Sequence, residues 1–253
     1  MPDHPFEFFD GGVSPIEAFR TDCDALLALQ EASAFGGDDA SFLIVATPPI
    51  AFVSLMAFVE GFFKSTFGAI ANMSPTALAQ FVEKRRDVSV PLDDLLLLRD
   101  RLEHRIGSLT AERLDFGSAK KINANFLDLL SISPFSTADV QTYESALSLR
   151  NQLVHHGGII TAKYFRQQRS SEATTADIYW SSVEVTQRTV IDAITFLLAI
   201  AMKFTEESVN RLTELEGEKM LESGSDRYPI FKYLRGDFSI FDPRRKFRTE
   251  IQK

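Results

Sequence analysis

Most of the chain carries apolar residues at intervals of three and four positions, the spacing that places them along one face of a helix. Ser, Pro and Gly residues stand where these stretches begin or end, as they do at helix caps. The pattern predicts helices at about residues 15–34, 49–73, 75–86, 91–109, 118–130, 137–156 and 186–215. The expected fold class is therefore all-α.

The segment before the last predicted helix has a different pattern. Residues 159–165 and 178–185 are rich in β-branched and aromatic side chains, and they flank the polar stretch RQQRSSEATTAD. Short runs of this composition on either side of a polar loop are typical of paired strands. We therefore expect a small β-hairpin inserted before the last long helix.

An uncharged run of eighteen residues, 42–59, is long enough on length alone to cross a membrane. Pro48 and Pro49 interrupt this run. A proline lacks the backbone N–H and forces the preceding residue into extended geometry, so it starts a helix more readily than it continues one. We expect a helix that begins near Pro49 and lies in the protein core, and no membrane span.

Composition agrees with a globular chain. Hydrophobic residues make up 45% of the 253 residues, enough for a sizeable core. Cys23 is the only cysteine, so the chain offers neither an internal disulfide nor a thiolate zinc site, which favours a reducing compartment. The first residues, MPDHPFEFFDGG, are acidic and do not resemble a signal peptide. The expected localisation is cytoplasmic.

The net charge of −8 is unevenly distributed along the chain. Residues 227–253 contain eight basic and three acidic side chains, and their densest basic run is RRKFR at 244–248. Local positive potential attracts anions, and an aromatic ring among cations can stack on a base. Arg244, Arg245 and Lys246 are therefore candidates for substrate contacts, with a solvated tail as the alternative. Smaller basic clusters lie at Lys84-Arg85-Arg86 and Lys120-Lys121.

These patterns predict three segments. Residues 1–40 form an N-terminal helix, residues 41–216 form the main helical domain with the hairpin, and residues 217–253 form a basic C-terminal extension. The break at 217 rests on the change in charge, and the break near 40 rests on the glycines that follow the first helix.

The stretch RNQLVHHGG, residues 150–158, ends the helix predicted at 137–156. Asn151 and His155 are four residues apart and share a helix face, and the long side chain of Arg150, about 140° away, can reach the same site. The two glycines end the helix, so the histidine lies in its last turn. Two interpretations remain open at this point. The cations cap helix carbonyls and favour the helix dipole, or they form an active site.

The spacing of this stretch resembles the signature of the HEPN superfamily, an all-α fold found in many prokaryotic ribonucleases. That signature is an arginine, an adjacent polar residue and a histidine several positions later. His155 follows Arg150 after four intervening residues, and His156 follows it after five. The resemblance covers about residues 45–210. The helix around Phe58 to Phe63 is similar to an early helix of the family that carries a glutamate facing the site, which implies a role for Glu60.

The resemblance implies a HEPN-like helical bundle and a metal-independent endoribonuclease, with a toxin or a phage-defence effector as the expected setting. It implies that Arg150, Asn151 and His155 are catalytic, with His156 and Glu60 as accessory candidates. It also implies an RNA substrate, a homodimer with a composite site, and a cognate antitoxin or regulatory partner. The alternative is a non-catalytic HEPN-like module for dimeric interaction or nucleotide binding.

Other chemistry has little support in the sequence. The chain has no Gly-rich phosphate loop and no Gly-x-Ser-x-Gly motif, and its four histidines lack metal-ligand spacing with carboxylates. We expect no cofactor and no metal. Glu60 is a single charge in an apolar stretch, and it is either a buried partner for Arg150 or an exposed position.

Overall fold

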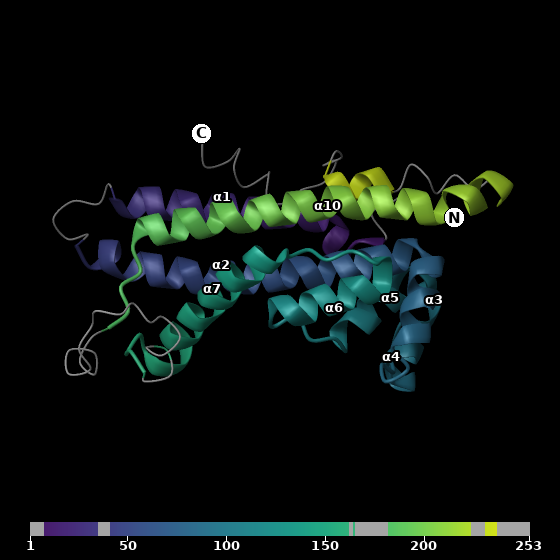
Figure 1. The fold of residues 1–253 in the computed structure, drawn as a ribbon, viewed down its shortest axis with the longest axis horizontal. Helices are drawn as coiled ribbons and strands as arrows, with labels where there is room; N and C mark the ends of the chain where they lie inside the picture. Colours follow the sequence, from purple (N-terminus) through teal and green to yellow (C-terminus); the bar gives the residue numbers. More distant parts are fainter. Residues whose placement is uncertain (1–7, 35–40, 162–163, 165–181, 224–230, 237–253) are drawn as a thin grey trace. The chain divides into compact units, whose positions relative to one another are not determined.

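The computed structural model describes residues 8–34, 41–161, 164, 182–223 and 231–236, and in these residues the chain is mostly helical (Figure 1). This confirms the all-α class. The α-helices are α1 (Pro15–Ala34), α2 (Ser41–Met73), α3 (Pro75–Lys84), α4 (Leu92–Leu97), α5 (Leu102–Glu112), α6 (Ala119–Leu130), α7 (Thr137–His156) and α10 (Gln187–Ser223). Short 3₁₀ turns are η2 (Asp10–Gly12), η4 (Arg99–Arg101) and η5 (Lys232–Arg235).

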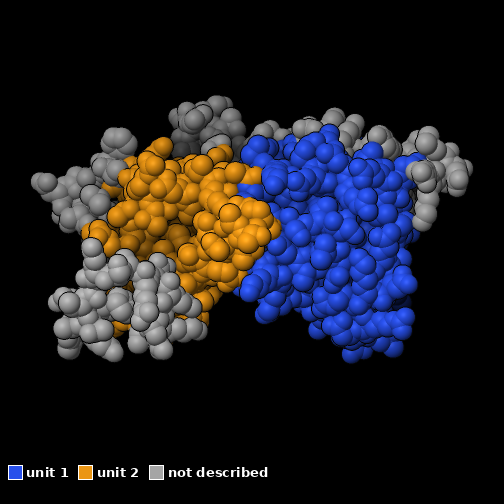
Figure 2. Space-filling model, viewed as in Figure 1, with its two compact units in different colours: residues 1–20, 61–134, 200–253 blue, residues 21–60, 135–199 orange. Residues whose placement is uncertain are grey.

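Two compact units make up the chain, and both are discontinuous in sequence (Figure 2). Unit 1 comprises residues 1–20, 61–134 and 200–253, and unit 2 comprises residues 21–60 and 135–199. The helices α1, α2 and α10 each contribute residues to both units. The three predicted segments, 1–40, 41–216 and 217–253, stay a prediction.

A cluster of phenylalanine rings forms the core of unit 1. The ring of Phe126, in α6, lies 4.5 Å from that of Phe204, in α10, and 5.8 Å from that of Phe67, in α2. All three side chains are fully buried. Edge-to-face and tilted contacts at such distances add to the free energy gained by burying the rings. The apolar spacing that predicted these helices therefore converges on one aromatic core.

Within unit 1, helices α2 and α5 approach closely at two glycines. A Cβ atom on Gly107 would lie 2.5 Å from the carbonyl oxygen of Gly68, which no side chain tolerates. Asn72 completes the contact: its Oδ1 accepts from the N–H of Gly107 at 2.7 Å, and its Nδ2 donates to the carbonyl of Phe8 at 3.2 Å and to Ser108 Oγ at 3.1 Å. This buried carboxamide has partners for both of its polar atoms.

The prediction that α2 begins near Pro49 is wrong. The helix begins at Ser41, and Pro48 and Pro49 lie inside it. Each proline removes one backbone hydrogen bond to the residue four positions earlier, but one turn of helix before a proline is tolerated when packing supports it. Pro48 is buried here. One helix, Val45–Met73, is thus long and apolar enough to cross a membrane, and 44% of its most apolar window is buried.

Two other predicted helices have different bounds in the structure. The helix expected at 91–109 is divided into α4 and α5, because Leu98 and the 3₁₀ turn Arg99–Arg101 interrupt it. The stretch around this break is rich in charge and carries exposed leucines at Leu96 and Leu97. The last helix, α10, runs to Ser223 and so extends beyond the expected end near residue 215. Helical periodicity alone contains no signal for either difference.

The expected β-hairpin falls largely on residues that the structure does not describe, at 162–163 and 165–181. Its two ends are joined: Ile159 and Ser182 form an isolated antiparallel β-bridge. Beside it, the N–H of Val183 donates to the carbonyl of Gly158 at 2.7 Å. The hairpin itself stays a prediction, and this bridge fixes where it would begin and end.

The expected C-terminal extension is described at residues 217–223, which continue α10, and at residues 231–236, and both parts belong to unit 1. Phe231 and Leu234 are buried, and the hydroxyl of Ser14 donates to the carbonyl of Leu234 at 3.0 Å. Arg235 pairs with Glu206 of α10 at 2.7 Å. This part of the extension is therefore attached to the start of α1 and to α10.

Candidate functional site

The helix that carries the candidate residues, α7, begins as its sequence predicts. Ser136 is its N-cap, and its side chain accepts from the N–H of Asp139 while the carboxylate of Asp139 accepts from the N–H of Ser136. This reciprocal capping box stabilises the first turn. The ring of Tyr143 packs on Phe135 with centroids 4.7 Å apart, which holds the first half of the helix against the chain that precedes it.

Two glycines end α7. Gly157 has φ 59° and Gly158 has φ 81°, a left-handed conformation that glycine adopts without strain. The N–H of Gly158 donates to the carbonyl of Gln152 at 3.0 Å, and the N–H of Ile159 donates to the carbonyl of His156 at 3.0 Å. Backbone groups therefore satisfy carbonyls of the last turn, as in other glycine-terminated helices.

The candidate catalytic side chains lie in the last two turns of α7. Asn151, His155 and His156 are exposed, and Arg150 is half-buried. Arg150 Nη1 donates to Asn151 Oδ1 at 3.1 Å, which joins the first two residues of the motif. Within the described residues, neither histidine forms a hydrogen bond or an ion pair with another side chain. The helix continues through His156, so Asn151 and His155 share a face as the spacing predicts.

Glu60 is exposed, which decides between the two interpretations that the sequence left open for it. Within the described residues no ion pair joins Glu60 to Arg150. Both nevertheless act on the buried phenol of Tyr143 in unit 2: burial raises the pKa of Tyr143, Glu60 raises it further, and Arg150 opposes the rise.

Tyr143 was not among the residues that the sequence pointed to. Its side chain is fully buried, and its hydroxyl has no hydrogen-bond partner among the described residues. Buried hydroxyl groups usually have a hydrogen-bond partner, so the unpaired hydroxyl of Tyr143 is an exception that needs an explanation. The available signal was its position seven residues before Arg150, which places it on the same helix face.

Gln152 was also missed, and it fixes the chain after the helix. Its Nε2 donates to Thr161 Oγ1 at 2.9 Å, and the same hydroxyl accepts from the N–H of Tyr164 at 3.2 Å. The backbone carbonyl of Gln152 accepts from the N–H of Gly158. Gln152 therefore holds the turn beyond His156 in place from inside the motif.

Three cations of the basic clusters of unit 1, Lys84, Arg85 and Lys121, bond to neighbouring groups, whereas Arg86 and Lys120 are exposed. Lys84 Nζ donates to the carbonyls of Leu127 and Asp128 at 3.4 and 3.2 Å. Arg85 pairs with Asp87 at 3.1 Å, and its hydrogen bond holds the pKa of that carboxyl below its ordinary value. Lys121 pairs with Asp115. These cations are engaged at helix ends and loops. Arg244, Arg245 and Lys246 lie outside the described residues.

The described part of the chain offers no ligand set for a metal ion. It contains no group of three or more His, Cys, Asp or Glu side chains placed to hold a metal ion. The arrangement at the end of α7 offers a cation, a carboxamide and exposed imidazoles, which are groups for binding an anion and moving a proton.

No family model matches this chain, and no curated protein and no solved structure shows significant similarity to it.

Proposed function

We propose that the protein is a metal-independent endoribonuclease of HEPN type, acting as a toxin or a phage-defence effector. The observation that supports it is the way α7 ends. Backbone N–H groups bond to the carbonyls of Gln152 and His156, and in the described residues Arg150, His155 and His156 do not donate to helix carbonyls. Two of these three cationic side chains are exposed beside a carboxamide that orients the third.

The residue types suit cleavage of RNA by its own 2′-hydroxyl. The 2′-oxygen attacks the neighbouring phosphorus as its proton passes to a base, the bond from phosphorus to the 5′-oxygen breaks, and that oxygen takes up a proton. The products are a 2′,3′-cyclic phosphate and a 5′-hydroxyl. His155 supplies proton transfer, because an imidazole nitrogen can both accept and donate a proton. Arg150 faces the charge that grows on the phosphate oxygens.

Asn151 is the orienting residue in this proposal. Its Oδ1 accepts from Arg150, which leaves its amide N–H groups to meet a phosphate oxygen or a ring nitrogen. His156 is the other candidate for the proton-transferring group, since it lies beside His155 in the same exposed turn. Glu60 is an accessory group, whose charge raises the pKa of the Tyr143 phenol while that of Arg150 lowers it.

The decisive experiment is incubation of purified protein with total RNA in the presence of EDTA, with His155→Ala as the matched inactive variant. We expect cleavage that EDTA does not suppress, and RNA fragments that end in a cyclic phosphate. RNA left intact by the wild-type chain but still bound by it would instead identify a non-catalytic RNA-binding or interaction module.

A shared site between two protomers is part of the proposal. One chain supplies one Arg-Asn-His set, and a two-fold axis near RNQLVHH would bring a second set to the same phosphate. Sedimentation should then give a species of twice the 28.4 kDa chain mass. A fully active monomer at all protein concentrations would remove the composite site and leave the chemistry to a single chain. A cognate antitoxin would be expected to cover the same exposed helix end.

A further inference from the structure

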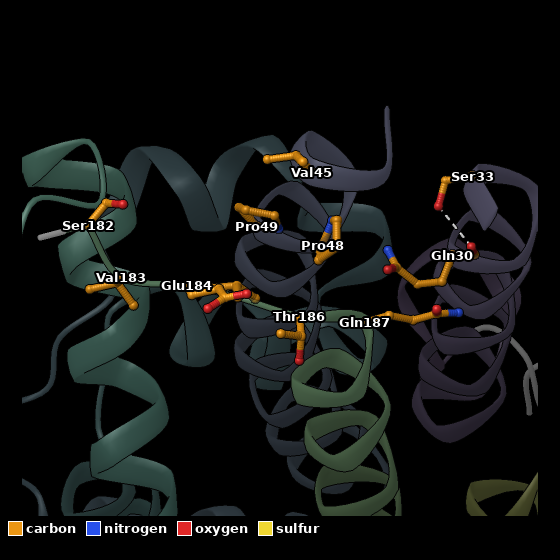
Figure 3. Close-up of a pocket in the computed structure, with 11 residues that line it drawn as sticks. Gln30, Ser33, Val45, Pro48, Pro49, Ser182, Val183, Glu184, Thr186 and Gln187 are labelled. Carbon is orange, nitrogen blue, oxygen red and sulfur yellow. Dashed lines mark hydrogen bonds between the residues drawn. The ribbon is translucent and has the colours of Figure 1, made fainter. Parts of the chain in front are cut away.

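Unit 2 contains a cavity of about 500 Å³, within the range that small ligands fill (Figure 3). Three parts of the chain form its walls: Gln30 near the end of α1, Val45 with Pro48 and Pro49 in α2, and the segment 182–187 before α10. All belong to unit 2. The cavity does not include the candidate catalytic side chains of α7.

Gln30 is the unusual residue of this cavity. Its side chain is 1% exposed, and neither its Nε2 nor its Oε1 has a hydrogen-bond partner among the described residues. Figure 3 shows its carboxamide directed toward Pro48, across the cavity wall. Its backbone carbonyl, in contrast, accepts from the hydroxyl of Ser33 at 2.8 Å. The unpaired groups are therefore confined to the side chain.

An unpaired buried amide is costly. Each buried donor or acceptor without a partner destabilises a fold by about 1–3 kcal/mol. Asn72 shows what the same functional group does elsewhere in the chain, since it is equally buried and both of its polar atoms are bonded. A leucine at position 30 would fill similar space at no such cost. The amide of Gln30 is thus explained by a partner that binds in the cavity.

The walls define the chemistry of that partner. Pro48, Pro49 and Val183 present aliphatic surface, and Glu184 adds an exposed carboxylate. Pro49 also has no N–H to donate to the carbonyl of Val45, four residues earlier in α2. No lysine or arginine lines the cavity among the described residues. Such walls favour a flat, uncharged ring that carries N–H donors, and they disfavour a phosphate.

We propose that this cavity binds a nucleobase with an exocyclic amino group. The carboxamide of Gln30 offers one donor and one acceptor side by side, which pair with the amino group and ring nitrogen of adenine or cytosine, or with the amide edge of guanine. The exposed carboxylate of Glu184 accepts from a further N–H group. In the structure, without a base, both polar atoms of the Gln30 amide are shielded from solvent. The side chain of Gln30 therefore changes rotamer when the base enters.

The cavity is also connected to the end of α7. Val183, in its wall, donates to the carbonyl of Gly158, and Ser182 bridges to Ile159. A base held here would therefore lie against the segment that directly follows His155 and His156. The base site itself rests on Gln30 and the cavity. Only the assignment of that base to an RNA strand rests on the proposed endoribonuclease function.

The direct test is calorimetric titration of the full chain with adenosine, cytidine, guanosine and uridine, beside adenosine monophosphate. At least one amino-bearing nucleoside should bind about 10-fold more tightly than uridine, whose N3–H and carbonyl can pair with Gln30 but which has no further N–H for Glu184. The monophosphate should bind no more tightly than adenosine, because the described residues of the walls supply no cation. Absence of saturable binding by all four nucleosides would overturn the proposal.

Two variants separate binding from folding. Gln30→Leu removes the amide and should abolish nucleoside binding while raising the thermal midpoint of the protein, because a buried unpaired group is lost. Gln30→Glu keeps the shape and the acceptor but removes the donor, and it should weaken binding about 10-fold or more. Gln141→Leu, at an exposed position of α7, is the control and should change neither quantity. Unchanged nucleoside binding in Gln30→Leu would exclude the cavity as the site.

A second titration identifies the source of the base. A short RNA is bound to His155→Ala, which does not consume it, with and without Gln30→Leu. Weaker RNA binding in the double variant identifies a base of the RNA strand, whereas loss of nucleoside binding alone identifies a free nucleoside or nucleotide. Nucleoside binding without RNA cleavage by the wild type would refute the endoribonuclease and leave the base site standing. RNA cleavage without nucleoside binding would refute the base site and leave the endoribonuclease standing.

Discussion

The C-terminal ends of α6 and α7 both lie beside basic or imidazole side chains, but the two helix ends are closed differently. At the end of α6, in unit 1, the N–H of Ser131 bonds to the carbonyl of Leu127, and Lys84 reaches across from α3 to the carbonyls of Leu127 and Asp128 as well. At the end of α7, in unit 2, backbone N–H groups bond to the carbonyls of Gln152 and His156. Cations lie at both helix ends, but only at α6 do they cap the helix.

This difference distinguishes structural from functional cations. A cation that bonds to helix carbonyls contributes to stability through the helix dipole and has little freedom to meet a substrate. At α7 the glycine stop takes over that task, and His155 and His156 remain exposed. Arg85 and Lys121 of unit 1 are also engaged by protein groups, since each is paired with a nearby carboxylate. The comparison favours RNQLVHH over the unit 1 clusters as the reactive surface.

The largest effect should come from the imidazole. If His155 transfers the proton, His155→Ala lowers the cleavage rate by about 100-fold to 10,000-fold. Its thermal midpoint should stay close to that of the wild type, because the side chain is exposed and bonds to nothing in the described structure. Rates on a labelled RNA and a thermal melt of the same samples are the measurements.

His156→Ala is the matched control for this substitution. It should retain activity if His155 is the proton-transferring group, and the two results should be interchanged if His156 is. A large fall in the thermal midpoint of His155→Ala, with activity retained, would assign that histidine to the helix end and make α7 resemble α6.

The next effect compares two arginines. Arg150→Lys keeps the charge but loses the forked guanidinium, and cleavage should fall by about 10-fold to 100-fold. Arg85→Lys makes the same change in unit 1, where the side chain is paired with Asp87. It should leave cleavage unchanged and lower the thermal midpoint only slightly, since exposed ion pairs contribute little. Equal losses of activity in both variants would remove the distinction between the two regions.

A smaller effect is expected from the basic run at the C-terminus. A chain of net charge −8 repels RNA at long range, so local cations have to draw it in. Replacing Arg244, Arg245 and Lys246 by alanine should weaken RNA binding and reduce the slope of log affinity against log salt by about 2. The cleavage rate at saturating RNA should not change. An unaltered slope would identify this run as a docking or structural segment.

The smallest effect concerns the two helix stops themselves. Gly157 and Ser131 have the same φ of 59° at the ends of α7 and α6. Gly157→Ala should cost about 1 kcal/mol in the free energy of unfolding, although a Cβ there would meet nothing within 4 Å. Ser131→Gly should stabilise the chain by about 0.5–1 kcal/mol for the same reason. Chemical denaturation measures both, and a stabilising Gly157→Ala would contradict the left-handed cap.

Local features of the fold follow from the sequence alone. The caps at Ser74, Ser118 and Ser136 each accept from an N–H three residues later, so both partners are visible in one short stretch. The helix end at Gly157 is equally local, because glycine relieves the strain of a left-handed residue. For these reasons the bounds of α1, α3, α6 and α7 and the position of RNQLVHH within its helix were predicted closely.

Other features depend on groups that are far apart in sequence. Whether the helix continues through Pro48 and Pro49 depends on the packing around them, and the break after Leu97 has no sequence signature. Lys84 and Leu127 are 43 residues apart, so no pattern predicts that one caps the other. The isolation of the Gln30 amide is likewise set by walls from α2 and from segment 182–187. Hydrogen bonds and burial between distant segments are decided only when the chain folds, which is why sequence periodicity locates the helices but not the partners of their side chains.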